Sequence, residues 1–415
     1  MFIVVTFLVA LFIHKSCSIY PTAESANTIN PILHASTAFT INGTVYVHGG
    51  SMIASNSNQL FSISFDEYGL LHYEIINEQG PAVSYHQAII LPGNDSFIVF
   101  GGLRYDFLDV SDAVEPIFAE VYSFSQNKWS ILPGLNQTAV PSDRQQHCAV
   151  MASNGLIYIH GGVVPGPGNS KILMDSWVYN PLTQAFTNLS TPPIGLYDSS
   201  AIALSDGRIL YVGGLTSKDS DYNYPFYLNR SMIYYTDNDT WIEQELKTQA
   251  IHVIDHYNIS RKDASAVLGP EGRYIYYFGG TNGFSGYDFE LYYNDILVLD
   301  TQSWTWVAPD ISGIKPTHRS ESIGARINNE YVLFGFGANS AYVYSEANFL
   351  RLPEVKKDTI SDAEDELDFE SLKWVYNITT GKTYYEQYPT VIPSGINKSA
   401  VIAITVVCGL VILSG

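Results

Sequence analysis

The chain has 415 residues, of which 46% are hydrophobic, so it can bury a large core and is not a disordered protein. Its 21 basic and 41 acidic residues give a formal charge of −20, which repels nucleic-acid phosphates, and we expect no nucleic-acid partner. Because repeat folds exceed the length of ordinary domains, internal periodicity has to be sought first.

The chain begins with an apolar run over residues 2–13 that is too short to span a bilayer but suits the core of a secretory signal peptide. The small residues Ser16 and Ser18 allow cleavage after position 18. We predict a signal peptide over 1–18, with an uncleaved anchor as the alternative. Residues 19–33 then form an N-terminal lead before the repeats.

Glycosylation sequons support passage through the secretory pathway. Nine asparagines begin an N-x-[ST] sequence: Asn42, Asn94, Asn136, Asn188, Asn229, Asn238, Asn258, Asn377 and Asn397. We therefore expect a glycoprotein. We expect no internal disulfide. Cys17 lies in the leader and Cys408 in an apolar tail, which leaves Cys148 without an internal partner.

A short run of β-branched and aromatic residues that ends in Gly-Gly recurs along the chain, at spacings of 52 to 66 residues. The glycine pairs are Gly49 and Gly50, Gly101 and Gly102, Gly161 and Gly162, Gly213 and Gly214, and Gly279 and Gly280. A sixth copy at 331–337 is degenerate, because Phe336 interrupts its pair. Glycine at the end of a strand suits backbone that must turn or pack closely.

Each run follows a second strand-like segment, and the Asn-Gly, Asp-Gly and Pro-Gly turns between them predict tight hairpins. Another hairpin with a bulky aromatic residue follows, at 120–132, 176–189, 232–244 and 295–307. Each repeat is therefore predicted to be four antiparallel strands, a to d. The aromatic residues that would fill the space between neighbouring units are Trp129, Trp241 and Trp304.

This pattern resembles the kelch repeat, whose marks are four apolar residues, Gly-Gly, a spaced Tyr and Trp, and then Pro, Arg and His. The second unit shows them in full with Tyr122, Trp129, Pro141, Arg144 and His147. The resemblance implies an all-β fold, a six-bladed kelch-type β-propeller over 34–390, with seven blades as the less favoured alternative. The glycines and blade aromatics are then structural residues.

In such a meander, the a–b and c–d turns lie on one face of the wheel, here called the turn face. The b–c loops and d–a connections lie on the other, here called the loop face. The b–c loops are long, at about 103–119, 163–174, 215–230, 281–293 and 338–371, and long loops on a rigid scaffold are typical of binding sites. Their candidate contact residues are Tyr105, Asp106, Tyr222, Tyr224, Tyr287 and Asp288.

The sixth unit is expected to end with a c–d pair at 372–388, after an acidic insertion at about 354–370. The insertion lacks the ligand spacing of a calcium loop, so it is interpreted as a flexible, solvent-exposed loop and no metal site is predicted. A linker over 391–399 leads to the apolar segment 400–415, which is predicted to be a truncated transmembrane helix or the signal for a lipid anchor.

Copper-radical oxidases such as galactose oxidase use a similar propeller, so an oxidase or another enzyme is the alternative function. Such a site needs a Cys before a Tyr-His pair, whereas Cys148 follows Tyr85 and His86. Because Cys148 lies where a first strand is expected, a small buried thiol is the simpler interpretation. No catalytic residue, cofactor or metal is predicted. Histidines that recur near the first two strands of the units are expected to line the channel or support turns: His48, His86, His147, His160 and His318.

The sequence thus predicts a recognition module rather than an enzyme. We expect it in the secretory pathway, at the cell surface or outside the cell, held at the membrane by its C-terminal segment. Its partner is expected to be a protein or a glycan that binds the loop face.

Overall fold

The computed structural model describes residues 38–52, 55–65, 71–104, 119–137, 139–164, 171–217, 224–248, 260–282, 291–340, 344, 347–353 and 369–375. Within these ranges every element is a strand except one short 3₁₀ helix, η1 (Phe369–Ser371). The predicted leader, N-terminal lead, juxtamembrane linker and anchor segment lie outside the described residues.

Six antiparallel meanders make up most of the described residues, each with strands a to d in chain order. The first three are β1 (Ala38–Ile41), β2 (Thr44–His48), β5 (Leu60–Phe65) and β6 (Leu71–Asn77); β8 (Gln87–Ile90), β9 (Ser96–Phe100), β11 (Ala119–Ser123) and β12 (Lys128–Ile131); and β13 (Cys148–Met151), β14 (Ile157–His160), β15 (Ser176–Asn180) and β16 (Ala185–Asn188). The next three are β18 (Ser200–Ala203), β19 (Arg208–Val212), β22 (Arg230–Tyr235) and β23 (Thr240–Glu245); β25 (Ser265–Leu268), β26 (Tyr274–Phe278), β27 (Ile296–Asp300) and β28 (Thr305–Val307); and β29 (Ile323–Arg326), β30 (Tyr331–Gly335), β31 (Ala347–Arg351) and β32 (Lys373–Val375).

Shorter strands pair within the b–c loops and between these loops and the d–a connections. They are β3 (Ser51–Met52) with β4 (Ser55–Asn56), β7 (Val83–Ser84) with β10 (Leu103–Arg104), and β17 (Gly195–Tyr197) with β20 (Leu215–Ser217) and β21 (Tyr224–Pro225). One further strand, β24 (Lys247–Thr248), leaves the fourth blade and pairs in parallel with β28 of the fifth. The outer edge of the fifth blade is thereby covered.

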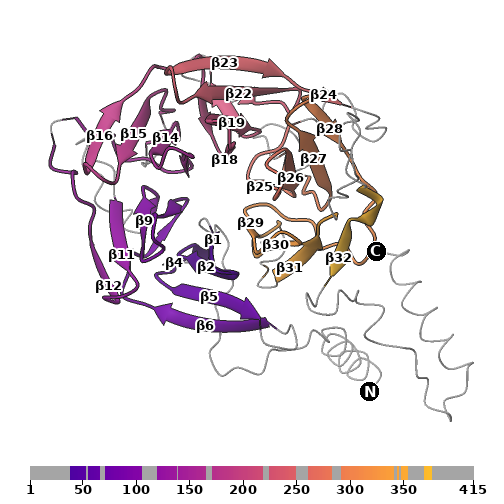
Figure 1. Cartoon of the computed structure of the whole chain (residues 1–415), viewed down its shortest axis with the longest axis horizontal. Helices are drawn as coiled ribbons and strands as arrows, with labels where there is room; N and C mark the ends of the chain where they lie inside the picture. Colours follow the sequence, from indigo (N-terminus) through magenta and orange to yellow (C-terminus); the bar gives the residue numbers. More distant parts are fainter. Residues whose placement is uncertain are drawn as a thin grey trace, which may run out of the picture.

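Figure 1 shows the six sheets arranged in a ring, with strand a of each sheet toward the centre and strand d at the rim. The inner strands contact one another in sequence, from β1 through β8, β13, β18 and β25 to β29, and β29 contacts β1. Six apolar clusters fill the spaces between neighbouring sheets, so the core is divided among the interfaces between blades. The structure confirms the predicted kelch-type propeller.

The ring closes by side-chain packing between the first and last sheets, which lie side by side in Figure 1. Phe61 of the first sheet and Leu333 of the last belong to one buried cluster. Phe336, the residue that interrupts the sixth glycine pair, joins the same cluster, and its ring centroid lies 5.7 Å from that of Phe61. The degenerate sixth repeat is therefore suited to its place at the closure.

The glycine pairs lie where neighbouring blades come closest. The second glycine donates its N–H to a carbonyl of the next blade, as Gly102 does to Arg144 at 2.8 Å and Gly280 does to Arg319 at 2.9 Å. A Cβ on Gly279 would lie 2.6 Å from the Arg319 carbonyl oxygen, closer than real Cβ contacts. The pairs are therefore needed for close approach between blades as well as for the left-handed backbone.

Gly279→Ala is expected to cost about 1–3 kcal/mol more than Gly155→Ala, because only the first places a methyl group against backbone of the next blade. Both glycines have a left-handed φ, 66° at Gly279 and 77° at Gly155. A Cβ on Gly155 would meet no heavy atom of the surrounding residues within 4 Å. Urea unfolding of the two variants measures the difference. Equal losses would show that backbone conformation alone selects glycine.

Strand d carries an aromatic residue that lies between neighbouring blades. The Trp129 ring centroid lies 5.0 Å from that of His48 in the preceding blade, and the Trp241 centroid lies 4.9 Å from that of His160. Phe186 takes this place in the third blade, where it pairs with Tyr179 as Trp129 pairs with Tyr122. These residues fill the interface, as predicted.

In the fifth blade the strand-d position belongs to Trp306, whereas Trp304, predicted for it, lies outside that strand and packs against the cluster between the fourth and fifth blades. Trp306 pairs with Leu299, is fully buried, and donates its Nε1–H to the Leu228 carbonyl oxygen at 2.8 Å. Trp304 lies in the c–d turn with φ of 55°, at the position held by Asn127 in the second blade. Trp304 lies seven residues after Leu297, and Trp306 lies seven residues after Leu299. Both match the repeat spacing, so the sequence alone does not show which tryptophan occupies strand d.

The sixth blade also differs from its prediction. Strand c is β31, which lies inside the range predicted to be the b–c loop 338–371, and strand d is β32, where the predicted c–d pair begins. Leu350 of β31 pairs with Trp374, so that tryptophan marks strand d as in the other blades. The acidic insertion therefore lies between strands c and d, and its residues 354–368 are outside the described residues.

Candidate functional site

Five residues that each lie two positions before an inner strand form a belt around one end of the central channel. These belt residues are Tyr85, Gln146, Asp198, Asp263 and Glu321, and all have a left-handed φ between 52° and 57°. Hydrogen bonds between successive blades join their backbones, from the amide of Gln146 to the carbonyl of Tyr85 (3.0 Å), Asp198 to Gln146 (3.0 Å), Asp263 to Asp198 (3.1 Å) and Glu321 to Asp263 (2.8 Å). The belt thus sets the five side chains around one ring.

A cavity of about 200 Å³ opens among the belt residues, and we call it the channel mouth. Below the belt it is lined by small residues of the inner strands, including Ala149, Ala201 and Gly324. Small side chains leave the channel open, whereas the larger belt residues supply its polar groups. Because the belt residues belong to the d–a connections, the channel mouth lies on the loop face.

The channel mouth is acidic. Asp198 is nearly buried, with 3% of its side chain exposed, and accepts a hydrogen bond from Gln146 Nε2 at 3.0 Å. Lys262 Nζ lies 3.1 Å from Asp263 Oδ2 and 3.9 Å from Asp198 Oδ2. Burial raises the pKa of Asp198 well above its usual value, and the Asp263 carboxylate raises it further. The raised pKa favours the neutral, protonated form of Asp198, so this carboxyl group adds less negative charge to the mouth than an exposed aspartate would.

Four buried histidines lie around the same end of the channel or between the blades beside it. His86 and His147 line the cavity, and His48 Nδ1 lies 3.2 Å from His86 Nε2. Burial lowers the pKa of His48 and His147 to about 3 and of His160 to about 4, so the rings are neutral near pH 7. His318, which the sequence groups with them, is exposed instead.

Lowering the pH from 7 to 5 is expected to reduce stability, and His147→Gln should remove about 2 kcal/mol of that reduction. The unfolded chain binds a proton at this residue below about pH 6.5, whereas the folded chain binds it only near pH 3, so unfolding is favoured between those values. Urea unfolding across this pH range measures the slope. His318→Gln is the control, and a slope unaltered by His147→Gln would contradict the account.

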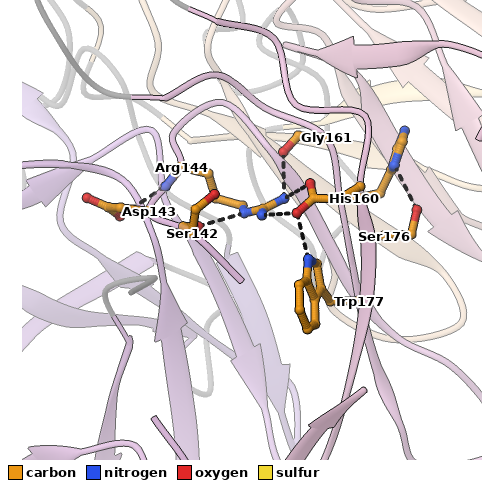
Figure 2. A network of polar contacts seen from close by, with 8 residues as sticks. Ser142, Asp143, Arg144, His160, Gly161, Ser176 and Trp177 are labelled. Atoms are coloured by element: carbon orange, nitrogen blue, oxygen red, sulfur yellow. Dashed lines mark hydrogen bonds and ion pairs between the residues drawn. The ribbon is translucent and has the colours of Figure 1, made fainter. Parts of the chain in front are cut away.

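Buried arginines fix the loop bases around the channel mouth. Arg144 reaches from the d–a connection to Asp175, with Nη1–Oδ1 and Nη2–Oδ2 distances of 2.9 and 2.8 Å. Figure 2 shows Arg144 with its polar contacts as dashed lines. Nη1 also donates to the Gly161 carbonyl oxygen at 3.1 Å. Arg261 repeats this arrangement two blades further on, with two 2.7 Å bonds to Asp295. Each pair thus joins a d–a connection to the base of a b–c loop.

The carboxylate of Asp175 is held by two groups. Burial acts to raise its pKa, but the hydrogen bonds and the charge of Arg144 outweigh burial and hold the pKa below its usual value. Trp177 Nε1 donates to the same carboxylate at 2.6 Å (Figure 2). Asp175 is therefore ionised and fixed immediately before strand β15, where the b–c loop ends.

Exposed apolar side chains lie on the loop face beside the channel mouth. Tyr224 is 51% exposed, and its strand β21 pairs through β20 with β17, which ends immediately before Asp198. Met174 and Leu291 are 41% and 45% exposed at the ends of two further b–c loops. Apolar groups around a polar centre are suited to a macromolecular partner.

Of the loop residues predicted to bind, only Tyr224 lies in the described part of the chain. Tyr105, Asp106, Tyr222, Tyr287 and Asp288 lie outside the described residues. Sequence reasoning selected the loop face but missed the belt residues. The belt residues share a position in the repeat, because each lies two residues before an inner strand and is followed by a His, Ser or Ala. This position could have identified them in the sequence, but their residue types differ from blade to blade.

Cys148 lies at the start of β13, is 3% exposed, and donates its thiol hydrogen to the Ser199 carbonyl oxygen at 3.1 Å. Burial raises the pKa of this thiol to about 12, so it is a poor nucleophile or metal ligand. The described residues contain no group of three or more His, Cys, Asp or Glu residues arranged to hold a metal. Nor do they include a helix long and apolar enough to cross a membrane.

Comparison with curated proteins finds kelch-repeat relatives. The chain is 30% identical over 115 residues to kelch-like protein terF of Aspergillus terreus, covering 28% of this chain and 24% of that protein. It is 34% identical over 119 residues to mouse kelch repeat and BTB domain-containing protein 3, covering 28% and 19%. Acyl-CoA-binding domain-containing protein 4 of Arabidopsis thaliana matches at 26% over 273 residues, covering 64% and 35%. The matches thus span about a third or less of each relative.

A solved structure, titled "Structure of YjhT", resembles this chain in fold with a TM-score of 0.58 at 15% identity, covering 81% of this chain and 98% of that one. The family model for the Attractin/LZTR1 beta-propeller matches residues 18–289. That range includes the first four blades and strands a and b of the fifth. The chain therefore belongs to the Attractin/LZTR1 β-propeller family.

Proposed function

We propose that this chain is a non-catalytic recognition module that binds a protein or glycan partner through its loop face. The channel mouth is the observation that carries the proposal, because its polar groups come from five blades and open on the face that bears the long b–c loops. The blades provide a rigid scaffold, and the Arg144–Asp175 and Arg261–Asp295 pairs fix the loop bases upon it. Rigid support for variable loops is typical of binding proteins.

The proposal includes the secretory pathway and a C-terminal membrane anchor. In the described part of the chain, all the sequon asparagines are exposed: Asn42, Asn94, Asn136, Asn188, Asn229 and Asn238. Asn42 and Asn94 lie in a–b turns and Asn238 in a c–d turn, so glycans there would lie on the turn face. Asn136, Asn188 and Asn229 lie at the loop-face ends of their blades, so glycans there would border the loop face. Enzymatic removal of N-glycans from the expressed chain should lower its mass, and an unchanged mass would contradict this part.

A matched pair of substitutions on the two faces tests the binding surface. Leu291→Asp places a charge on the loop face, where Leu291 is 45% exposed, and Leu182→Asp places one in a c–d turn, where Leu182 is 94% exposed. Partners cross-linked to the wild-type chain at cell surfaces should be lost with Leu291→Asp and retained with Leu182→Asp. The reverse result would assign binding to the turn face.

A further inference from the structure

At the rim of the wheel, the chain that leaves strand d of one blade contacts the outer edge of the next blade. After the third blade, the Ser190 carbonyl oxygen accepts a hydrogen bond from Trp241 Nε1 at 3.1 Å. After the fifth, Ser312 bridges in parallel to Lys373 of β32, and its carbonyl oxygen accepts the amide hydrogen of Trp374 at 2.9 Å. We call this the rim contact. The other three are Asn77 Oδ1 with Trp129 Nε1, Gln137 Nε2 with the Gln184 carbonyl oxygen, and the Lys247 amide with the Trp304 carbonyl oxygen.

Rim contacts thus join the second to sixth blades to the blade before each of them, and the first blade has no counterpart among the described residues. In that part of the chain, its edge strand β6 pairs with β5 alone. Tyr73 of β6 holds the strand-d aromatic position, because it pairs with Ile63 as Trp374 pairs with Leu350. The sixth blade precedes the first around the ring, so the chain that follows β32 is the one suited to this edge.

The residues after β32 repeat the sequence that makes the rim contact after the fifth blade. Residues 306–313 read WVAPDISG and residues 374–381 read WVYNITTG, so tryptophan, valine and glycine recur at the same positions and Thr380 replaces Ser312. We call residues 376–381, which lie outside the described residues, the exit segment. An internal repeat of this kind predicts the same course over the next blade.

The glycine of this pattern lies where the chain comes closest to the next blade. A Cβ on Gly313 would lie 2.5 Å from the Trp374 carbonyl oxygen, and a Cβ on Gly80 would lie 2.6 Å from the Trp129 ring. Both glycines follow the strand-d aromatic residue of their own blade by seven positions, and Gly381 follows Trp374 by seven. A glycine at this spacing indicates that the exit segment also passes close to a neighbouring blade.

We propose that the exit segment lies along the outer edge of β6 and makes the sixth rim contact, which closes the ring. In this arrangement Thr380 pairs with His72 as Ser312 pairs with Lys373, and the Thr380 carbonyl oxygen accepts the amide hydrogen of Tyr73. The first and last blades, whose described residues join by side-chain packing, thereby gain backbone hydrogen bonds. This role does not depend on the proposed recognition function.

Disulfide trapping in the full chain tests the proposal. Thr380→Cys with His72→Cys should form a disulfide, in a chain that also carries Cys17→Ser and Cys408→Ser. Bridged residues of neighbouring strands have Cα atoms about 5 Å apart, within the roughly 4.4–6.8 Å that a disulfide spans. Peptide mapping by mass spectrometry without reduction measures the yield.

Two cysteine pairs serve as controls. Ser312→Cys with Lys373→Cys traps the described rim contact and should form in similar yield. Lys128 holds in the second blade the position that His72 holds in the first, so Thr380→Cys with Lys128→Cys is the matched negative control. Its yield should be at least about tenfold lower, because the second blade is not adjacent to the sixth.

Hydrogen exchange gives a second readout that needs no cross-link. Gly381→Val should speed exchange of the Tyr73 amide at least about tenfold, because the added side chain separates the exit segment from β6. Gly395→Val, in the predicted juxtamembrane linker, should change that rate by no more than about twofold.

Three results would overturn the inference. The first is no disulfide between positions 380 and 72 although the 312–373 control forms. The second is equal trapping of Thr380→Cys by His72→Cys and Lys128→Cys. The third is an exchange rate of the Tyr73 amide that Gly381→Val leaves unchanged. A disulfide of His72→Cys with Ala26→Cys, in place of Thr380→Cys, would assign this edge to the N-terminal lead and would also overturn it.

Discussion

Arg144→Ala is expected to lower the free energy of unfolding by about 3–5 kcal/mol, the usual cost of removing one partner from a buried ion pair. The guanidinium is fully buried and holds both oxygens of Asp175, so its loss leaves that carboxylate without its counter-charge. The carbonyl oxygens of Gly161 and Ser142 lose donors as well. Urea unfolding measures the change.

The control for this prediction is the exposed ion pair between Arg230 and Glu243, whose side chains are 37% and 49% exposed. Arg230→Ala should cost no more than about 1 kcal/mol. Hydrogen exchange adds a local readout, because the amide of Leu173, which donates to the Gly162 carbonyl oxygen at the loop base, should exchange faster in Arg144→Ala. Similar losses in both variants would contradict a fixing role for Arg144.

Phe336→Ala is expected to cost about 3–5 kcal/mol, because it empties a buried site at the closure of the ring. Phe336 is fully buried between the first and last sheets and packs against Phe61. Phe336→Gly restores the residue found at this position in the other blades, and it should cost about 1–2 kcal/mol less than the alanine variant because it also relieves a left-handed φ of 57°. Thermal or urea unfolding measures both.

Gln184→Gly measures the effect of relieving a left-handed φ at a residue whose side chain is not packed in the core. Gln184 has a left-handed φ of 55° but is exposed, so glycine there should change stability by no more than about 1 kcal/mol, in the stabilising direction. If Phe336→Gly were as stable as the wild-type chain, packing of Phe336 would not contribute to closure of the ring. The contrast between the two sites thus tests why the sixth repeat departs from Gly-Gly.

The repeat, the meander and the loop face could be predicted from sequence because each is a local pattern. The hairpin turns recur in all six blades and Gly-Gly in five of them, because both meet backbone requirements that are set within a few residues. Trp304 and Trp306 could not be separated, because both fit the spacing and only the strand register distinguishes them. Strand β31 was missed because the insertion after it breaks the usual distance between Leu350 and Trp374.

The candidate site was harder to predict than the fold. Asp198, Asp263 and Glu321 lie about 60 residues apart in sequence and meet only because successive blades bring the same position to the channel. No residue type marks that position, since Tyr85 and Gln146 occupy it in other blades. The prediction therefore concentrated on Tyr-rich and Asp-rich b–c loops, whereas the described polar cavity belongs to the d–a connections.

Carboxylate footprinting tests most directly whether the channel mouth is the recognition site. The full chain, alone and bound to the partner captured by the loop face, would be labelled with a carbodiimide and an amine, and modification would be read by mass spectrometry. The account predicts that bound partner reduces labelling of Glu321 and Asp263 and leaves labelling of Asp237 and Glu330, which are exposed on the turn face, unchanged. Protection confined to Asp237 and Glu330, with the mouth carboxylates still labelled, would contradict it.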